Sequence, residues 1–180
     1  MTGHPHRRVR RNLTLVVGSV VAAAGIAAYA TQVAAREAAH EAQGADGDRP
    51  TGVYALSDEE IAAIRATIEP FAEPAAAEAA GRVNLDLCFD MMGDHYADPA
   101  TFGDGILDAA NPEALVYADV DGAPQLVAVE WVSTAPGEVL GMPLHLNHDL
   151  DVWVLHAWVG LDNPSGMLAD HNPNVGACPT

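Results

Sequence analysis

The chain has 180 residues, enough for one domain with a modest core once a targeting segment is set aside. It holds 8 Lys and Arg against 25 Asp and Glu, and the part beyond Ala30 carries all the acidic residues, four arginines and no lysine. Such a surface repels nucleic-acid phosphates and anionic lipid headgroups, so we expect no nucleic-acid partner, whereas metal ions, cationic partners or a saline medium are compatible with it.

Residues 1–30 have the pattern of a signal peptide or a membrane anchor. Four arginines precede an uncharged run from Leu13 to Ala30, which as a helix would extend roughly 27 Å, just enough for a bilayer core. The run ends in Ala28-Tyr29-Ala30, an A-x-A cleavage pattern that predicts a mature start at Thr31. If the helix is not cleaved, the arginines would stay inside and the helix would hold the protein in the membrane. Both interpretations predict an extracytoplasmic location.

Residues 31–54 are expected to form a flexible tether, and residues 55–180 a single domain. Ser57 and Glu60 have the spacing of a capping box and predict the start of a helix. Apolar residues then recur at helical spacing, at Ile61, Ile64, Ile68 and Phe71. A second helix is expected from Pro74 to a C-terminal glycine, Gly81.

Beyond Gly81 the pattern is typical of β-strands. Residues 83–88 alternate between apolar and polar side chains, and further strands are predicted at 114–120, 125–134 and 150–159. Asp121-Gly122 predicts a hairpin turn between two of them, while residues 89–111 and 135–147 are expected to be irregular. The predicted class is α+β, with one or two helices packed on a curved antiparallel sheet of about four strands, rich in loops.

The chain contains two cysteines, Cys88 and Cys178. An even number of cysteines in an exported chain predicts a disulfide, which would fasten the C-terminal tail to the first strand. Two buried thiols or a metal-binding pair are the alternatives.

Histidines are the main candidates for a functional site. His145 and His148 could bind one metal ion from a loop or a helical turn, but on a strand they would point to opposite faces. His156 falls on a largely apolar strand face and is either a core histidine or a ligand. His95 and His171 lie in irregular segments beside the two cysteines, so a disulfide would bring these segments together. Zinc or copper is the candidate cofactor, although no established metal-ligand spacing is present.

Other sequence motifs for metal binding, catalysis or nucleotide binding are absent or weak. Asp119 and Asp121 resemble half a calcium loop but are better explained by the hairpin turn. The sequence has no nucleophile elbow, phosphate-binding loop or dinucleotide fingerprint, and cysteines held in a bridge could not act as nucleophiles.

Several segments together resemble a family of exported bacterial proteins. They span roughly residues 75–179 and are Met92-Gly93-Asp94-His95-Tyr96, residues 112–117, 126–131 and 155–158, and Asn163-Pro164-Ser165-Gly166-Met167 leading to Asn172-Pro173 and Cys178. The family usually has an aromatic residue where this chain has His171, which argues against His171 as a shared ligand. The resemblance directs attention to His95, Glu130 and His156 and implies no activity.

Three hypotheses follow for the function. The first is a binding module of the cell envelope that holds a metal ion or a small ligand, with ligand candidates His95, Tyr96, Glu130 and His156 and metal candidates His95, His148 and His156. The second is an envelope enzyme resembling a metal-assisted hydrolase that uses the same residues. The third is an accessory subunit that partners an envelope protein and stays in the membrane through an uncleaved N-terminal helix.

Overall fold

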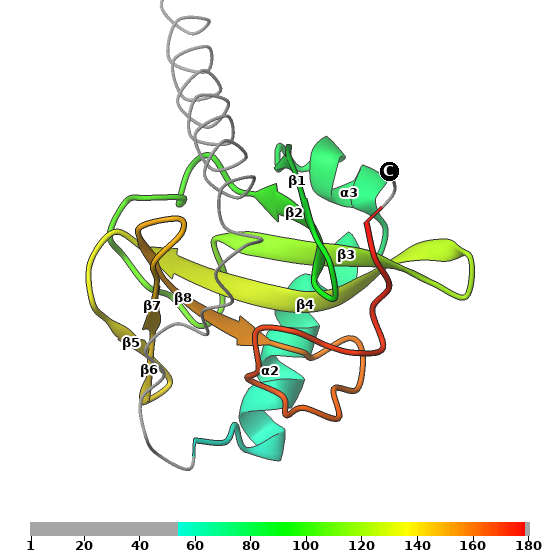
Figure 1. Cartoon of the computed structure of the whole chain (residues 1–180). Coiled ribbons are helices and arrows are strands. Elements are labelled where there is room, and N and C mark those ends of the chain that lie inside the picture. The colour runs from blue at the N-terminus through cyan, green and yellow to red at the C-terminus, as the bar shows by residue number, and fades with distance from the viewer. Residues whose placement is uncertain (1–53, 179–180) are drawn as a thin grey trace, which may run out of the picture.

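The computed structural model describes residues 54–178 as one α+β fold (Figure 1). The predicted targeting segment and all but the last residue of the predicted tether lie outside this range. Within residues 54–178, no helix has both the length and the apolar character needed to span a bilayer.

Within the described residues the helical part comes first, and it confirms the predicted start of the first helix. Helix α2 (Asp58–Ile68) begins with a complete capping box, in which the Ser57 backbone N–H donates to the Glu60 carboxylate at 2.7 Å. It continues into a short 3-10 helix, η1 (Glu69–Phe71), and then into α3 (Pro74–Ala79). Pro70 and Pro74 supply no backbone N–H, which explains why the chain forms three short pieces rather than one long helix.

The sheet is antiparallel throughout and larger than predicted. Among residues 54–178, its six strands run in the order β1-β2-β3-β4-β8-β7, and a separate pair, β5 with β6, forms a small hairpin. The strands are β1 (Val83–Phe89), β2 (Gly93–Ala97), β3 (Ala114–Val120), β4 (Ala123–Ser133), β5 (Glu138–Val139), β6 (Met142–Pro143), β7 (His145–Asn147) and β8 (Val152–Ala157). The strand count of about four was therefore wrong, because β2 and β7 lie in segments expected to be irregular.

The two faces of the sheet are covered by different parts of the chain. On one face, Leu115, Tyr117 and Trp131 pack with Ile64 and Ile68 of α2. We call this the helix face. On the opposite face, the residues that pack together include Val116 and Ala128 of the sheet and Val175 of the C-terminal tail, so we call it the tail face.

The tail, residues 158–178, is fastened to the sheet at several points. The predicted disulfide between Cys88 and Cys178 is present, with a Cα–Cα distance of 5.9 Å, and it is typical of an extracytoplasmic environment. The Asn172 backbone N–H donates to the Met91 carbonyl at 2.8 Å, and the Trp158 indole N–H donates to the Ala169 carbonyl. These bonds hold the intervening segment, which includes Asp170, against the tail face.

Candidate functional site

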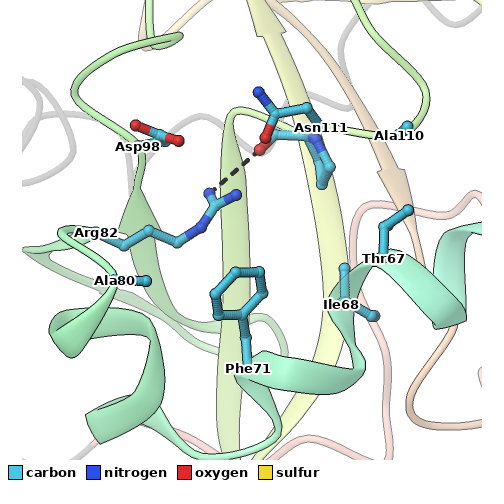
Figure 2. Close-up of a pocket in the computed structure, with 9 residues that line it drawn as sticks. Thr67, Ile68, Phe71, Ala80, Arg82, Asp98, Ala110 and Asn111 are labelled. Atoms are coloured by element: carbon cyan, nitrogen blue, oxygen red, sulfur yellow. Dashed lines mark hydrogen bonds between the residues drawn. The ribbon is translucent and has the colours of Figure 1, made fainter.

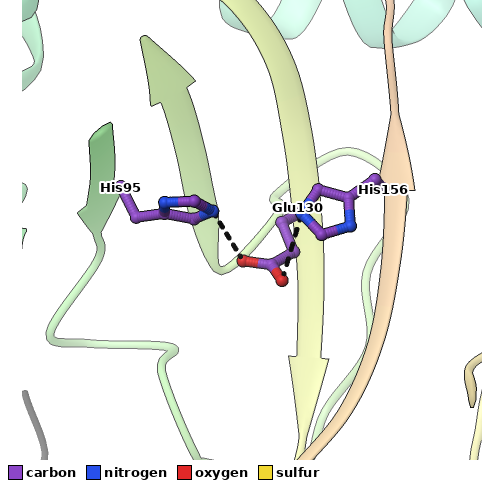
Figure 3. Close-up of side chains that lie close together, drawn as sticks. All are labelled: His95, Glu130 and His156. Atoms are coloured by element: carbon purple, nitrogen blue, oxygen red, sulfur yellow. Dashed lines mark ion pairs between the residues drawn. The ribbon is translucent and has the colours of Figure 1, made fainter. Parts of the chain in front are cut away.

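Three buried polar side chains from three strands meet on the tail face (Figure 3). His95 lies on β2, Glu130 on β4 and His156 on β8. The two oxygens of Glu130 face different imidazoles: Oε2 lies 3.7 Å from His95 Nε2, and Oε1 lies 3.4 Å from His156 Nε2. The carboxylate thus lies between the two rings.

Strand register explains how these side chains meet. Glu130 and His156 are direct cross-strand partners, and the next partner in the same row is Ala114 of β3. His95 belongs to the neighbouring row, opposite Val116. Strand β3 lies between β2 and β4, which are therefore about 10 Å apart. Side chains of β2 and β4 can come into contact across β3 only where β3 has a small residue. Ala114, which is fully buried, is that residue.

The C-terminal tail adds a second carboxylate to the cluster. Asp170 Oδ1 lies 3.6 Å from His156 Nδ1 and 3.1 Å from His145 Nε2. Each ring nitrogen of His156 therefore faces a different carboxylate, Glu130 on one side and Asp170 on the other. The result is a row of alternating imidazoles and carboxylates, from His95 through Glu130, His156 and Asp170 to His145.

Burial determines the charge state of at least one of these histidines. The residues His95, Glu130 and His156 are only 4%, 7% and 2% exposed. Burial lowers the pKa of His95, because the imidazolium is poorly solvated there, and this outweighs the opposing effect of Glu130. His95 is therefore neutral at pH 7, with one ring nitrogen available as a lone-pair donor.

The separations in the cluster can be compared with those expected between the ligands of a metal ion. Good N–H···O hydrogen bonds are about 2.7–3.2 Å long, shorter than both contacts of Glu130. Zinc bonds to nitrogen and oxygen of about 2.0–2.2 Å in a tetrahedral site place neighbouring ligand atoms about 3.3–3.5 Å apart. One ligand atom from each of His95, Glu130 and His156 lies within 4.8 Å of the others. The cluster could hold a metal ion if its ligand atoms moved closer together.

The remaining candidates from the sequence lie elsewhere. Tyr96 belongs to the helix face, where its ring packs edge-on against Tyr117 and its hydroxyl accepts a hydrogen bond from Asn84. His148 is exposed in the turn between β7 and β8, and His171 is exposed in the tail. The structure places none of these three in the cluster. The Asp121-Gly122 segment forms the predicted hairpin turn between β3 and β4.

Sequence reasoning missed two of the acidic residues that matter here. Asp170 was not a candidate, although the expected closeness of the segments around His95 and His171 pointed to its surroundings. Glu113, which precedes β3, is 1% exposed and accepts a hydrogen bond from the Val132 backbone N–H at 3.0 Å. Burial raises its pKa to about 7. Nothing in the local sequence distinguishes Glu113 from an ordinary surface glutamate.

Comparison with known proteins assigns no family or function to this fold and site. No family model, curated protein or solved structure matches the chain. The resemblance drawn from the sequence remains an expectation.

Proposed function

We propose that the domain is an extracytoplasmic binding module that holds one divalent transition-metal ion, zinc or copper, between His95, Glu130 and His156. The observation that carries the proposal is the convergence of two imidazoles and one carboxylate from three different strands. Two nitrogen donors and one anionic oxygen donor form a set that binds zinc or copper(II) and leaves a further coordination position for water or another ligand.

The surroundings of the three residues support the same proposal. Ligating histidines usually direct their second ring nitrogen at a carboxylate or a backbone carbonyl, which fixes the ring orientation. Asp170 faces the second nitrogen of His156, and backbone groups of Leu87 and Gly93 interact with the ring of His95. Because metal binding requires deprotonated imidazoles, the lowered pKa of His95 also favours it.

Burial favours binding over catalysis. An envelope enzyme that uses the same residues is the alternative, but a metal-assisted reaction needs a substrate to reach the open coordination position. Residues that are 2–7% exposed are suited to retaining an ion more than to admitting a substrate. The third hypothesis, an accessory subunit held in a membrane, depends on residues 1–30 and remains an expectation.

The test is metal binding by disulfide-bonded protein purified without a histidine tag. After treatment with a chelator, calorimetric titration with zinc or copper should give one ion per chain. Glu130→Gln keeps the side-chain volume but removes the anionic ligand, and it should weaken binding about 100-fold or more. Asp170→Asn leaves the three ligands in place and removes the charge behind His156, and it should weaken binding about 10- to 100-fold.

His148→Gln is the matched control, because it removes an exposed imidazole outside the cluster. It should bind zinc as the wild type does. Absence of stoichiometric binding in the wild type, or equal affinities in Glu130→Gln and His148→Gln, would refute the metal site.

A further inference from the structure

A second polar site lies on the helix face, away from the His95–Glu130–His156 cluster. It is a pocket of about 110 Å³ between α2, η1 and the segment that connects β2 to β3 (Figure 2). Its polar walls come from Thr67, Arg82, Asp98 and Asn111, and Ile68 and Phe71 supply apolar surface. A single water needs roughly 10–15 Å³ of such space, so the pocket has room for a molecule of several heavy atoms.

Arg82 provides a buried positive charge at this pocket. The residue is 7% exposed, and its guanidinium lies over the Phe71 ring with 5.3 Å between Cζ and the ring centroid. It donates a hydrogen bond from Nη1 to the Pro112 carbonyl at 3.2 Å. A guanidinium has five N–H donors in a planar fork that matches the two oxygens of a carboxylate. Since Arg82 lines the pocket, this fork could bind the acid group of a ligand there.

Asp98 provides a negative charge at the same pocket. Its Oδ1 accepts a hydrogen bond from the Ala100 backbone N–H at 2.9 Å, which fixes the side chain at the start of the connecting segment. Asp98 interacts electrostatically with Arg82, but within residues 54–178 no ion pair within 4.0 Å joins the two. The pocket therefore presents one cation and one anion on separate parts of its wall.

The charge of the whole domain decides which ligand suits this arrangement. Residues 54–178 contain two arginines, no lysine and most of the chain's 25 acidic residues, so a free anion is repelled before it arrives. A zwitterion has no net charge and avoids this repulsion. We propose that the pocket binds a small zwitterion, an α-amino acid with a short side chain, whose carboxylate bonds to Arg82 and whose ammonium group faces Asp98.

Calorimetric titration of the disulfide-bonded protein with four probes tests the proposal. Glycine and L-alanine should bind, whereas acetate and methylammonium, each carrying one half of the zwitterion, should bind about 10- to 100-fold more weakly. Acetate that binds as tightly as glycine, or no binding by either amino acid, would overturn the proposal. The test needs no metal ion, so its outcome is separate from that of the metal site.

Asp98→Asn tests whether the charge of Asp98 recognises the ammonium group. The amide oxygen can still accept from Ala100, but the charge is lost, so glycine should bind about 10- to 100-fold more weakly and acetate more tightly than in the wild type. Asp104→Asn is the matched control, since Asp104 caps the same connecting segment at the Ile106 N–H and is exposed. Equal effects of the two substitutions on glycine binding would contradict the assigned role of Asp98.

Discussion

Glu113 is a buried carboxyl group whose ionisation should make the stability of the fold depend on pH. Desolvation raises its pKa to about 7, and the hydrogen bond from Val132 opposes this rise only in part. In the unfolded chain the same group ionises near pH 4.5. Its contribution to stability is fully present below about pH 4.5 and is lost as the pH rises through about 7.

Glu113→Gln should remove this dependence, because the amide oxygen can still accept from Val132 and no charge has to be buried. Relative to the variant, the wild type should lose on the order of 2 kcal/mol of unfolding free energy between pH 5 and pH 8. Urea unfolding at the two pH values measures the difference. The exposed Glu138→Gln is the control and should not alter the pH dependence; a constant gap between wild type and Glu113→Gln would argue against a buried titration.

At the level of residues, the sequence could direct attention to His95, Glu130 and His156 but could not show that they meet. Their meeting depends on the register of three strands and on the small side chain of Ala114 between them. Asp170 could not be assigned a role, because its place is set by the path of an irregular tail that has no periodicity. His148 looked like a ligand from its spacing to His145, yet the strand–turn boundary separates the two.

Among the strands, β2 depends on a close approach of backbones at its first residue. Gly93 has a φ of +113°, and a Cβ there would collide with the carbonyl oxygen of Tyr117 on β3. Gly105 also has a positive φ, of +80°, but faces open space. Substituting each of these two glycines therefore separates the cost of an unfavourable backbone conformation, which both share, from the cost of crowding between strands, which only Gly93 has.

Gly93→Ala should lower the unfolding free energy by about 1–3 kcal/mol more than Gly105→Ala, because only the first substitution forces β2 away from β3. Urea unfolding of both variants gives the comparison. Since β2 carries His95, zinc affinity should also fall in Gly93→Ala and stay unchanged in Gly105→Ala. Similar losses of unfolding free energy in the two variants would mean that β2 and β3 can move apart with no loss of stability.

Elements with local signals could be predicted, and those defined by tertiary contacts could not. The capping box predicted the start of α2, and Asp121-Gly122 predicted the hairpin between β3 and β4. Strand β2 is buried at four of its five positions, so it has no polar side to produce alternation. Strand β7 has only three residues and exists because it pairs with β8.

Over the whole molecule, the disulfide links the first strand to the tail that covers the sheet. Its cysteines are 90 residues apart, and the entropy of closing a loop of this length corresponds to about 4.6 kcal/mol of stability on the chain-entropy model. The double variant Cys88→Ser, Cys178→Ser should therefore unfold at a lower urea concentration than the oxidised wild type.

Adding a reductant should lower the wild type to the level of the double variant and leave the double variant unchanged. This comparison separates loss of the bridge from loss of the sulfur atoms. Equal urea midpoints for the oxidised wild type and the double variant would show that the hydrogen bonds of the tail suffice without the bridge.

The scarcity of basic residues also determines how this protein can be detected. Trypsin cuts after lysine and arginine, and between residues 54 and 178 it would find only Arg65 and the buried Arg82. Even after unfolding, everything from Val83 to Cys178 stays in one fragment, too long for routine peptide mapping, and no lysine is present for amine-reactive cross-linkers. A protease that cuts after acidic residues would divide the same region into many short peptides.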